Sequence, residues 1–151
     1  MKTTQGDLIS LARDGEFDLI VHGCNCFGTM GAGIAKGIKA AFPQAFEADR
    51  ATAKGNKAKL GTCSFAEIVA NGRTVIVINA YTQFDWRGSG LNVDYEAVRS
   101  CMRWITERFP GRRIGLPKIG AGLAGGDWTI IAAIIDEELA GEDVTLVEYM
   151  P

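Results

Sequence analysis

The stretch His22-Gly23-Cys24-Asn25-Cys26-Phe27-Gly28-Thr29-Met30-Gly31-Ala32-Gly33-Ile34-Ala35 decides the fold. It follows the apolar run Leu19-Ile20-Val21, which is typical of a buried strand. Apolar positions at helical spacing then continue to Phe42, so the stretch connects a strand to a helix. Amides at a helix N-terminus attract anions, and glycines let the backbone approach phosphate oxygens. The loop therefore predicts a phosphate site, although a tight turn without a ligand stays open.

A second glycine-rich loop, Pro117-Lys118-Ile119-Gly120-Ala121-Gly122-Leu123-Ala124-Gly125-Gly126-Asp127, repeats this arrangement. It follows a predicted strand over 113–117 and leads into a helix that Asp127 can cap. Two such loops at the carboxyl ends of strands can face each other across a crevice, where open α/β sheets place ligands. The first loop has neither the spacing of a dinucleotide-binding motif nor that of a P-loop. We therefore expect them to bind two phosphates, or one phosphate and a ribose.

Strand and helix patterns alternate along the chain, which predicts an α/β sheet covered by helices. The β-branched run from Thr74 to Tyr81 is the strongest strand signal. Asn71-Gly72 before it predicts a hairpin with a strand over 62–69. The other expected helices cover 31–42, 43 to about 53, 94 to about 109 and 128–139, and the closing strand covers 144–149.

Composition and charge exclude several classes of protein. A length of 151 residues with 47% apolar residues fits a single globular domain. The formal net charge is −2, whereas a dedicated nucleic-acid binder usually has a basic surplus, so direct nucleic-acid binding is not expected. The absence of a long apolar run or an apolar signal segment predicts no membrane partner. The four cysteines match no disulfide scaffold, which indicates a reduced, cytoplasmic protein.

The order and spacing of four motifs resemble the macrodomain family. Gly6-Asp7-Leu8 resembles a family motif whose aspartate binds the adenine amino group, and Leu19 to Asn25 resembles the strand that ends in the asparagine holding the distal ribose. Met30 to Ala35 resembles the first phosphate loop, and Ile119 to Leu123 resembles the second, which wraps the diphosphate. The resemblance covers nearly the whole chain. It implies one three-layer α/β/α domain over residues 1–151, with a mixed, mainly parallel sheet of about six strands.

The stretch His22-Gly23-Cys24-Asn25-Cys26 most resembles the ADP-ribose-1″-phosphate phosphatases of that family. A related branch removes ADP-ribose from glutamate or from DNA bases. In the glutamate-directed branch a lysine follows the long central strand, where this chain has Thr82 or Gln83. An aspartate follows the Gly-Leu of the second loop in that branch, where this chain has Ala124. A covalent lysyl route is therefore not expected. The resemblance implies hydrolysis of the terminal phosphate of ADP-ribose-1″-phosphate; release of ADP-ribose from protein or nucleic acid, and non-catalytic ADP-ribose binding, stay open.

His22 and Asn25 are the candidate catalytic residues. His22 is the only histidine, and at a strand end beside the first loop an imidazole can act as acid, base or phosphate donor. The alternative is a half-buried histidine satisfied by backbone groups. The resemblance implies that Asn25 holds the distal ribose, and the alternative is a turn asparagine in the left-handed conformation.

The candidate ligand-binding residues come from the two loops and from both ends of the chain. Tyr149 could stack on adenine or simply pack at a strand end. Asp7 could accept from the adenine amino group or serve a turn. Trp86 could cover the substrate, although a surface position is favoured. The full set is Asp7, Leu8, Gly31, Ala32, Gly33, Ile34, Ile119, Gly120, Ala121, Gly122, Leu123 and Tyr149.

No metal or other cofactor is expected. His22, Cys24 and Cys26 are too few and too closely spaced for a closed zinc site, and the two cysteines are better interpreted as small buried packing residues. The lysines between 54 and 59 are interpreted as a solvated loop. The expected partner is ADP-ribose or ADP-ribose-1″-phosphate and, in the alternative, an ADP-ribosylated macromolecule.

Overall fold

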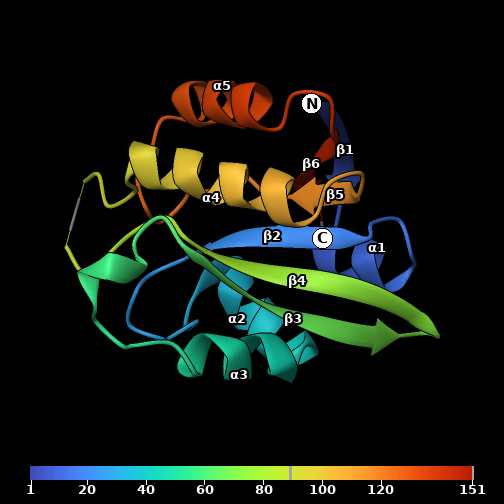
Figure 1. The fold of residues 1–151 in the computed structure, drawn as a ribbon, viewed down its shortest axis with the longest axis horizontal. Helices are drawn as coiled ribbons and strands as arrows, with labels where there is room; N and C mark the ends of the chain where they lie inside the picture. Colours follow the sequence, from blue (N-terminus) through green and yellow to red (C-terminus); the bar gives the residue numbers. More distant parts are fainter. Residues whose placement is uncertain (89, 151) are drawn as a thin grey trace.

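In the computed structural model, which describes residues 1–88 and 90–150, six strands form one mixed sheet between two groups of helices (Figure 1). The strand order is β1-β6-β5-β2-β4-β3; β3 is antiparallel to β4, and the other neighbouring pairs of the described chain are parallel. In chain order the elements are β1 (Lys2–Gly6), α1 (Leu8–Arg13), β2 (Leu19–Cys24), α2 (Gly33–Ala41), α3 (Pro43–Arg50), a 3-10 turn (Lys57–Lys59), β3 (Cys63–Ala70), β4 (Arg73–Tyr81), α4 (Tyr95–Arg108), β5 (Arg113–Leu116), α5 (Trp128–Glu138) and β6 (Asp143–Tyr149).

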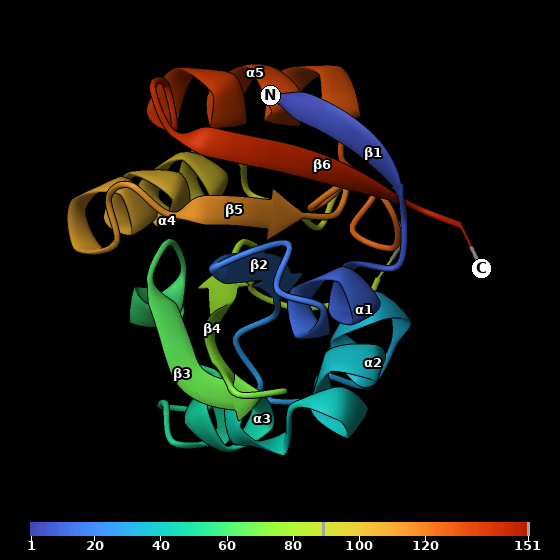
Figure 2. The same ribbon diagram turned by 90° about the vertical axis from the view of Figure 1, so that its right-hand side faces the viewer.

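Helices cover both faces of the sheet and complete the three layers. Helices α4 and α5 pack on one face, and α1, α2 and α3 pack on the other (Figures 1 and 2). In β2, Leu19 and Val21 belong to the core under α4 and α5, whereas Ile20 belongs to the core under α1 to α3. A strand buried on both faces is apolar without alternation. The predicted three-layer α/β/α architecture is confirmed.

The turn between β3 and β4 has the geometry that its sequence predicts. Asn71 and Gly72 have φ angles of +52° and +77°, and they connect the paired residues Ala70 and Arg73. Positive φ at both central residues is the requirement of a type I′ hairpin turn. The predicted hairpin is therefore confirmed.

The two long helices begin at the aspartates that the sequence indicates. The Asp94 side chain accepts a hydrogen bond from the Ala97 amide, and the Asp127 side chain accepts one from the Thr129 amide. These acceptors satisfy amides that have no partner within the helix. The apolar residues Val98, Cys101, Met102, Ile105 and Phe109 follow helical spacing, and all of them are buried.

The first strand and the first helix have no counterpart in the sequence-based prediction. β1 has the polar sequence Lys-Thr-Thr-Gln-Gly and lies at the sheet edge beside β6, with its first four residues exposed. A polar edge strand shows no alternation of apolar and polar residues, so it carries no periodic signal. α1 has only six residues, which is too short for a helical period to emerge.

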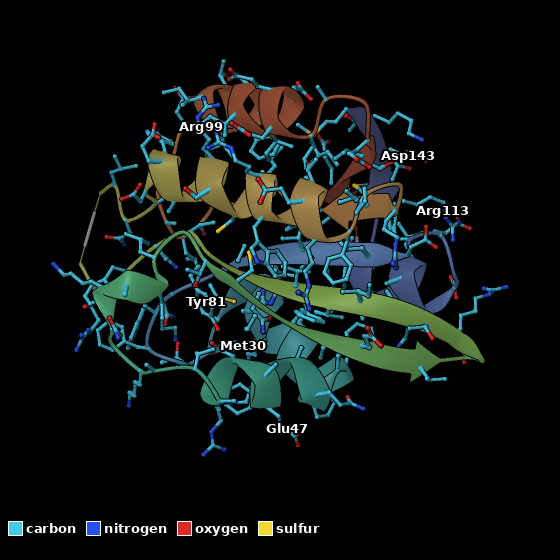
Figure 3. The ribbon with its side chains drawn as sticks, in the orientation of Figure 1. Met30, Glu47, Tyr81, Arg99, Arg113 and Asp143 are labelled. Carbon is cyan, nitrogen blue, oxygen red and sulfur yellow. The ribbon has the colours of Figure 1, made fainter. Side chains whose placement is uncertain are left out.

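Ion pairs between elements lie at the surface. Arg99 of α4 contacts Glu137 and Glu138 of α5 at 3.0 and 2.8 Å, and Arg113 contacts Asp18 at 2.8 Å. Figure 3 shows Arg99 and Arg113 at the periphery of the molecule. The Arg99–Glu138 pair is partly buried, whereas the others are more exposed. Water screens charge pairs at the surface, so they add little to stability and the core supplies most of it.

No helix of the described residues is long and apolar enough to cross a membrane.

Replacing Asp94 with Ala is expected to lower the free energy of unfolding by about 1 kcal/mol, because the first turn of α4 loses its side-chain acceptor. Urea unfolding at pH 7 measures this difference. Glu47→Ala, which removes an exposed carboxylate from α3 (Figure 3), is the control and should change the free energy by less than about 0.5 kcal/mol. Equal unfolding midpoints for Asp94→Ala and the wild type would contradict the capping role.

Candidate functional site

A cavity of about 750 Å³ lies where the carboxyl ends of β4, β2 and β5 meet. β2 lies between the other two strands and is parallel to both. The segments that follow these strands therefore begin at the same sheet edge, where α/β folds place their ligands. Parts of the segments 25–32 after β2, 82–88 after β4 and 117–124 after β5 contribute to the lining. The volume is in the range of sites for small organic ligands.

The first glycine-rich loop lines the cavity as predicted. Gly31, Ala32, Gly33 and Ile34 all belong to the lining. Ala32 is the N-cap residue of α2, and an alanine side chain offers no acceptor to the amides of the first turn. These amides remain available to an anion, and the helix dipole favours negative charge beside them. The left-handed φ of +42° at Met30 turns the chain toward the helix.

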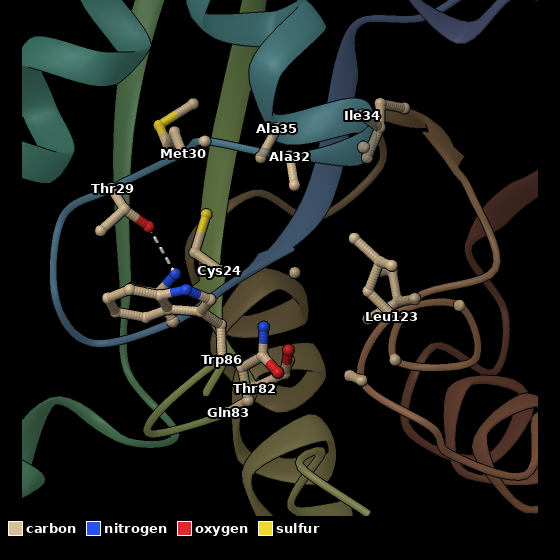
Figure 4. Close-up of a pocket in the computed structure, with 18 of the residues that line it drawn as sticks. Cys24, Thr29, Met30, Ala32, Ile34, Ala35, Thr82, Gln83, Trp86 and Leu123 are labelled. Atoms are coloured by element: carbon tan, nitrogen blue, oxygen red, sulfur yellow. Dashed lines mark hydrogen bonds between the residues drawn. The ribbon is translucent and has the colours of Figure 1, made fainter. Parts of the chain in front are cut away.

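The second glycine-rich loop forms the opposite wall. Ile119, Gly120, Gly122 and Leu123 line the cavity, whereas Ala121 is not among the lining residues. The loop is closed by hydrogen bonds from the Gly125 and Gly126 amides to the carbonyls of Gly122 and Gly120, at 3.1 and 2.7 Å. Four of the five residues predicted here therefore reach the cavity. Figure 4 shows Leu123 and Ile34 on one side, and Thr29, Gln83 and Trp86 at what we call the Trp86 end.

His22 is completely buried and is not among the residues that line the cavity. Its Nε2 lies 2.7 Å from Asn79 Oδ1, and Asn79 Nδ2 donates to the Ala45 carbonyl at 2.9 Å. Cys24, whose Sγ lies 3.6 Å from the same Nε2, does line the cavity. The side chain of Cys24 therefore lies between the predicted catalytic histidine and the cavity. Burial lowers its pKa to about 4, so its ring is neutral at pH 7, and the geometry favours a role in positioning β2 against β4.

Asn25 lines the cavity, but its side chain also organises the loop. Its Nδ2 donates to Thr29 Oγ1 at 2.8 Å (Figure 4), and its Oδ1 accepts from the Phe27 amide at 2.8 Å. The second bond is that of an Asx turn. An amide oxygen has two lone pairs, so Oδ1 can still accept from a ligand hydroxyl. Asn25 therefore serves the turn and remains accessible to a ligand.

The residues predicted to bind adenine lie beyond the cavity lining. Asp7 is the N-cap of α1, and its Oδ1 accepts from the Ser10 amide at 3.0 Å. Leu8 is buried in the core. Gly6 pairs with Tyr149 across β1 and β6, so Asp7 and Tyr149 lie near each other at the carboxyl edge of the sheet. Tyr149 is 71% exposed. β5 separates these two strands from β2.

Asp49 is a lining residue that the sequence analysis did not single out. It lies on α3 and is 1% exposed. The Tyr81 hydroxyl donates to its Oδ1 at 2.7 Å. Burial raises the pKa of Asp49, and the hydrogen bond from Tyr81 opposes that rise. One signal could have revealed it: Asp49 follows the buried Ala45 by four residues, so both lie on the same face of the helix.

Lys59 contradicts the interpretation of residues 54–59 as a solvated lysine loop. It is only 7% exposed, and its Nζ donates to the Cys26 carbonyl at 3.3 Å. The same ammonium lies 4.4 Å from the centroid of the Tyr81 ring. The loop folds back under the first glycine loop, and local charge patterning does not reveal such a contact. The buried positive charge opposes the rise in the pKa of Asp49.

Trp86 lies in the loop after β4, where its side chain is exposed, as the sequence favoured, and also contributes to the cavity lining. Its ring makes an edge contact with Phe27, with centroids 5.8 Å apart, and is 44% exposed. The Arg87 guanidinium lies over both rings and is paired with the Asp85 carboxylate at 2.7 Å. The Trp86 end thus combines an aromatic surface with a neutralised charge pair.

The described residues bring together no group of three His, Cys, Asp or Glu side chains that could hold a metal ion. Cys24 and Cys26 are buried free thiols. Burial raises the pKa of both, so they are protonated at neutral pH. Their role as small packing residues, which the sequence favoured, agrees with this environment.

Comparison with known proteins gives both family and fold. The model of the Macro domain family matches residues 21–135. The chain is 36% identical to an uncharacterized 17.5 kDa protein from the tk-vs intergenic region of Enterobacteria phage T4, over 100% of this chain and 97% of that protein. The chain is also 22% identical to a DNA ADP-ribosyl transferase–DNA ADP-ribosyl glycohydrolase fusion protein of Thermosipho africanus. This match covers 84% of this chain and 37% of the fusion protein.

A solved structure shows the same fold with a ligand. Thermosipho africanus DarTG in complex with ADP-ribose matches with a TM-score of 0.76 and 20% identity, over 100% of this chain and 42% of that one. At this identity the likeness concerns the fold alone.

The burial of neutral His22 predicts a pH dependence of stability. Unfolded histidine binds a proton near pH 6.5 and folded His22 only near pH 4, so the unfolded state binds more protons between these values. The free energy of unfolding should therefore fall as the pH drops through this window, by up to about 1.4 kcal/mol per pH unit from this residue. Urea unfolding of the wild type and His22→Gln at several pH values isolates its contribution.

The single histidine also permits a direct check by NMR. The carbon-bound ring protons of His22 should keep their neutral-state shifts from pH 7 down to about pH 5. A titration centred near pH 6.5 in the folded protein would contradict the buried neutral state.

Proposed function

The chain belongs to the Macro domain family, and on that premise we propose that its cavity binds ADP-ribose and that the protein hydrolyses a substituent from the 1″ carbon of the distal ribose. The observation that carries the proposal is the pair of glycine-rich loops on opposite walls of one cavity. Backbone amides at two strand-to-helix turns suit a diphosphate, which presents negative charge to both. The names of the Thermosipho relatives point to the same ligand.

In this proposal the diphosphate lies between residues 31–34 and 119–123. The adenine then extends toward the ends of β1 and β6, where Asp7 can accept from the amino group through Oδ2 and Tyr149 can stack on the base. The distal ribose extends toward the Trp86 end, where Asn25 Oδ1 can accept from a hydroxyl. Loop amides stabilise charge on the phosphates, and the grip on the ribose fixes the orientation of the bond to be cleaved.

We propose a macromolecule as the leaving group, in line with the glycohydrolase named in the Thermosipho fusion protein. The Trp86 end carries a side chain that is 44% exposed, so a substituent on the 1″ carbon can extend into solvent there. The net charge of −2 argues against general affinity for nucleic acid, so recognition would reside in the ADP-ribose group.

Hydrolysis of ADP-ribose-1″-phosphate is the second candidate. The sequence His22-Gly23-Cys24-Asn25-Cys26, which resembles the phosphatase branch, favours it. The position of His22 behind the wall weakens a direct role for its imidazole, and in this reaction too His22 would position Cys24 and the first loop.

Water is the expected nucleophile in either reaction. Thr82 and Gln83 occupy the segment after β4, and Ala124 follows Leu123; all four line the cavity. None of them can supply the lysine or the aspartate of a covalent lysyl route. A group that accepts a proton from water is therefore required elsewhere in the lining.

We also propose a cytoplasmic location. The four cysteines are free thiols, and three of them are buried. Reducing compartments keep cysteines in this state.

The reaction is tested by incubating the protein separately with mono-ADP-ribosylated DNA, mono-ADP-ribosylated protein and ADP-ribose-1″-phosphate, and by separating the products by chromatography. The proposal predicts free ADP-ribose from one of the two macromolecules. Phosphate and ADP-ribose from the third substrate alone would establish the phosphatase instead. Binding of ADP-ribose without product from any substrate would contradict hydrolysis and assign the chain as a non-catalytic reader.

Gly122→Glu tests the second loop directly. A Cβ at this exposed position meets no atom within 4 Å, so the fold should tolerate a side chain there. A carboxylate beside the diphosphate should raise the Kd for ADP-ribose about tenfold or more, with little change in Tm. Ala133→Glu adds the same charge to the exposed face of α5 and should leave the Kd unchanged. Equal affinities for both variants would exclude the second loop from the site.

A further inference from the structure

Two oxygen atoms in the cavity wall lack a hydrogen-bond partner. Among the described residues, the buried side-chain atoms without one are Asp49 Oδ2 and Gln83 Oε1, and both residues line the cavity. Both atoms accept hydrogen bonds, so both require a donor. A buried acceptor without a partner is costly, so such atoms in a cavity mark places where a bound molecule donates.

The Asp49 carboxylate is held in one orientation from behind. Its Oδ1 accepts from the Tyr81 hydroxyl at 2.7 Å. That hydroxyl also contacts Ser64 Oγ at 2.8 Å and Thr52 Oγ1 at 3.3 Å, which fixes it in turn. The other oxygen, Oδ2, lies 4.0 Å from the position that a Cβ on Gly28 would occupy, so it is directed toward the first glycine loop. Gly28 immediately precedes Thr29, which lies at the Trp86 end, so Asp49 presents one free acceptor on that side of the cavity.

The charges around Asp49 suit a proton acceptor. Lys59 and Tyr81 favour its ionised form, whereas burial disfavours it and raises the pKa. The thiols of Cys24 and Cys26 also face this group, and both are protonated at neutral pH because burial raises the pKa of each. A carboxylate whose pKa is raised toward neutrality accepts a proton more readily than an exposed one.

No other group of the described lining combines charge, burial and a free acceptor. Asp49 is the only carboxylate among those residues. Lys118, the other charged residue there, is exposed and lies 3.8 Å from the Glu148 carboxylate. His22 is neutral and lies behind the wall. The proton acceptor that a water-based reaction requires is therefore best supplied from α3.

We propose that Asp49 is a catalytic residue, the general base that binds and deprotonates the attacking water at the Trp86 end. The water oxygen forms a bond to the 1″ carbon while the bond from that carbon to the leaving atom breaks. The water proton passes to Asp49 Oδ2, and the leaving atom keeps the electron pair and takes a proton from solvent. Gln83 Oε1 offers a second acceptor, for a hydroxyl of the distal ribose. The assignment rests on the proposed function, because it requires the distal ribose at this end.

Asp49→Asn is the first test, because it keeps the shape of the side chain and removes its basicity. On the substrate that the wild type cleaves, kcat/KM should fall about 10²–10⁴-fold, while the Kd for ADP-ribose changes less than about threefold. Asp136→Asn, which neutralises a 53% exposed carboxylate on α5, should retain wild-type kcat/KM.

The other outcomes separate the two proposals. Wild-type kcat/KM in Asp49→Asn would overturn the assignment of Asp49 and leave the proposed function intact. A rise in Kd equal to the loss in kcat/KM would assign Asp49 to binding alone and would likewise overturn it as a base. A wild-type protein that binds ADP-ribose but cleaves no substrate would overturn the proposed function, and the assignment with it.

Tyr81→Phe provides a second variant if Asp49→Asn does not fold. Tyr81 acts through Asp49 as a positioning residue, and its hydrogen bond lowers the pKa of the carboxyl group. Without this bond Asp49 is protonated at higher pH, so the acid limb of kcat/KM against pH should move to higher pH. On the alkaline side of that limb, the loss of activity should be smaller than in Asp49→Asn. An acid limb at the same pH in Tyr81→Phe and wild type would overturn the assignment.

Discussion

The central place of β2 in the sheet is the constraint on which the site depends. Parallel pairing sets Leu19 beside Ile76 of β4 and Ile114 of β5, and this register brings three carboxyl ends to one edge. The segments that follow must then meet above that edge. A shift of one residue would also separate His22 from Asn79, which are paired across β2 and β4, and leave buried polar atoms without partners, so this pair favours the register.

The same strand pairing separates the residues that line the cavity from the polar residues buried behind them. Behind the wall, His22 and Asn79 form a neutral hydrogen-bonded pair between β2 and β4. Around the cavity, the two glycine-rich loops supply mainly backbone amides, which suit phosphates and offer no strong base. The buried carboxylate comes instead from the helix layer, where Tyr81 and Lys59 hold Asp49. In the proposed reaction, anion binding and proton transfer therefore depend on different layers of the fold.

The loops could be predicted from the sequence because their glycines stand between a strand pattern and a helix pattern. Residues 31–34 and most of 119–123 do reach the cavity. The helical spacing of Asp49 from Ala45 could have indicated a buried position, but neither its place in the cavity nor the burial of Lys59 could be predicted. Both result from the packing of α3 and the 57–59 turn beneath the first loop. β1 was missed for a different reason: a polar edge strand has no buried face to impose a pattern. A periodic sequence pattern predicts which face of a helix or strand is buried, but it does not predict contacts between distant segments.

A crystal structure of the protein with ADP-ribose tests the central claim most directly, namely that two loops bind one diphosphate. The account predicts phosphate oxygens within hydrogen-bonding distance of amides in both 31–34 and 119–123, with the distal ribose at the Trp86 end of the cavity. A diphosphate that contacts only one loop, or a ligand bound elsewhere on the molecule, would contradict it.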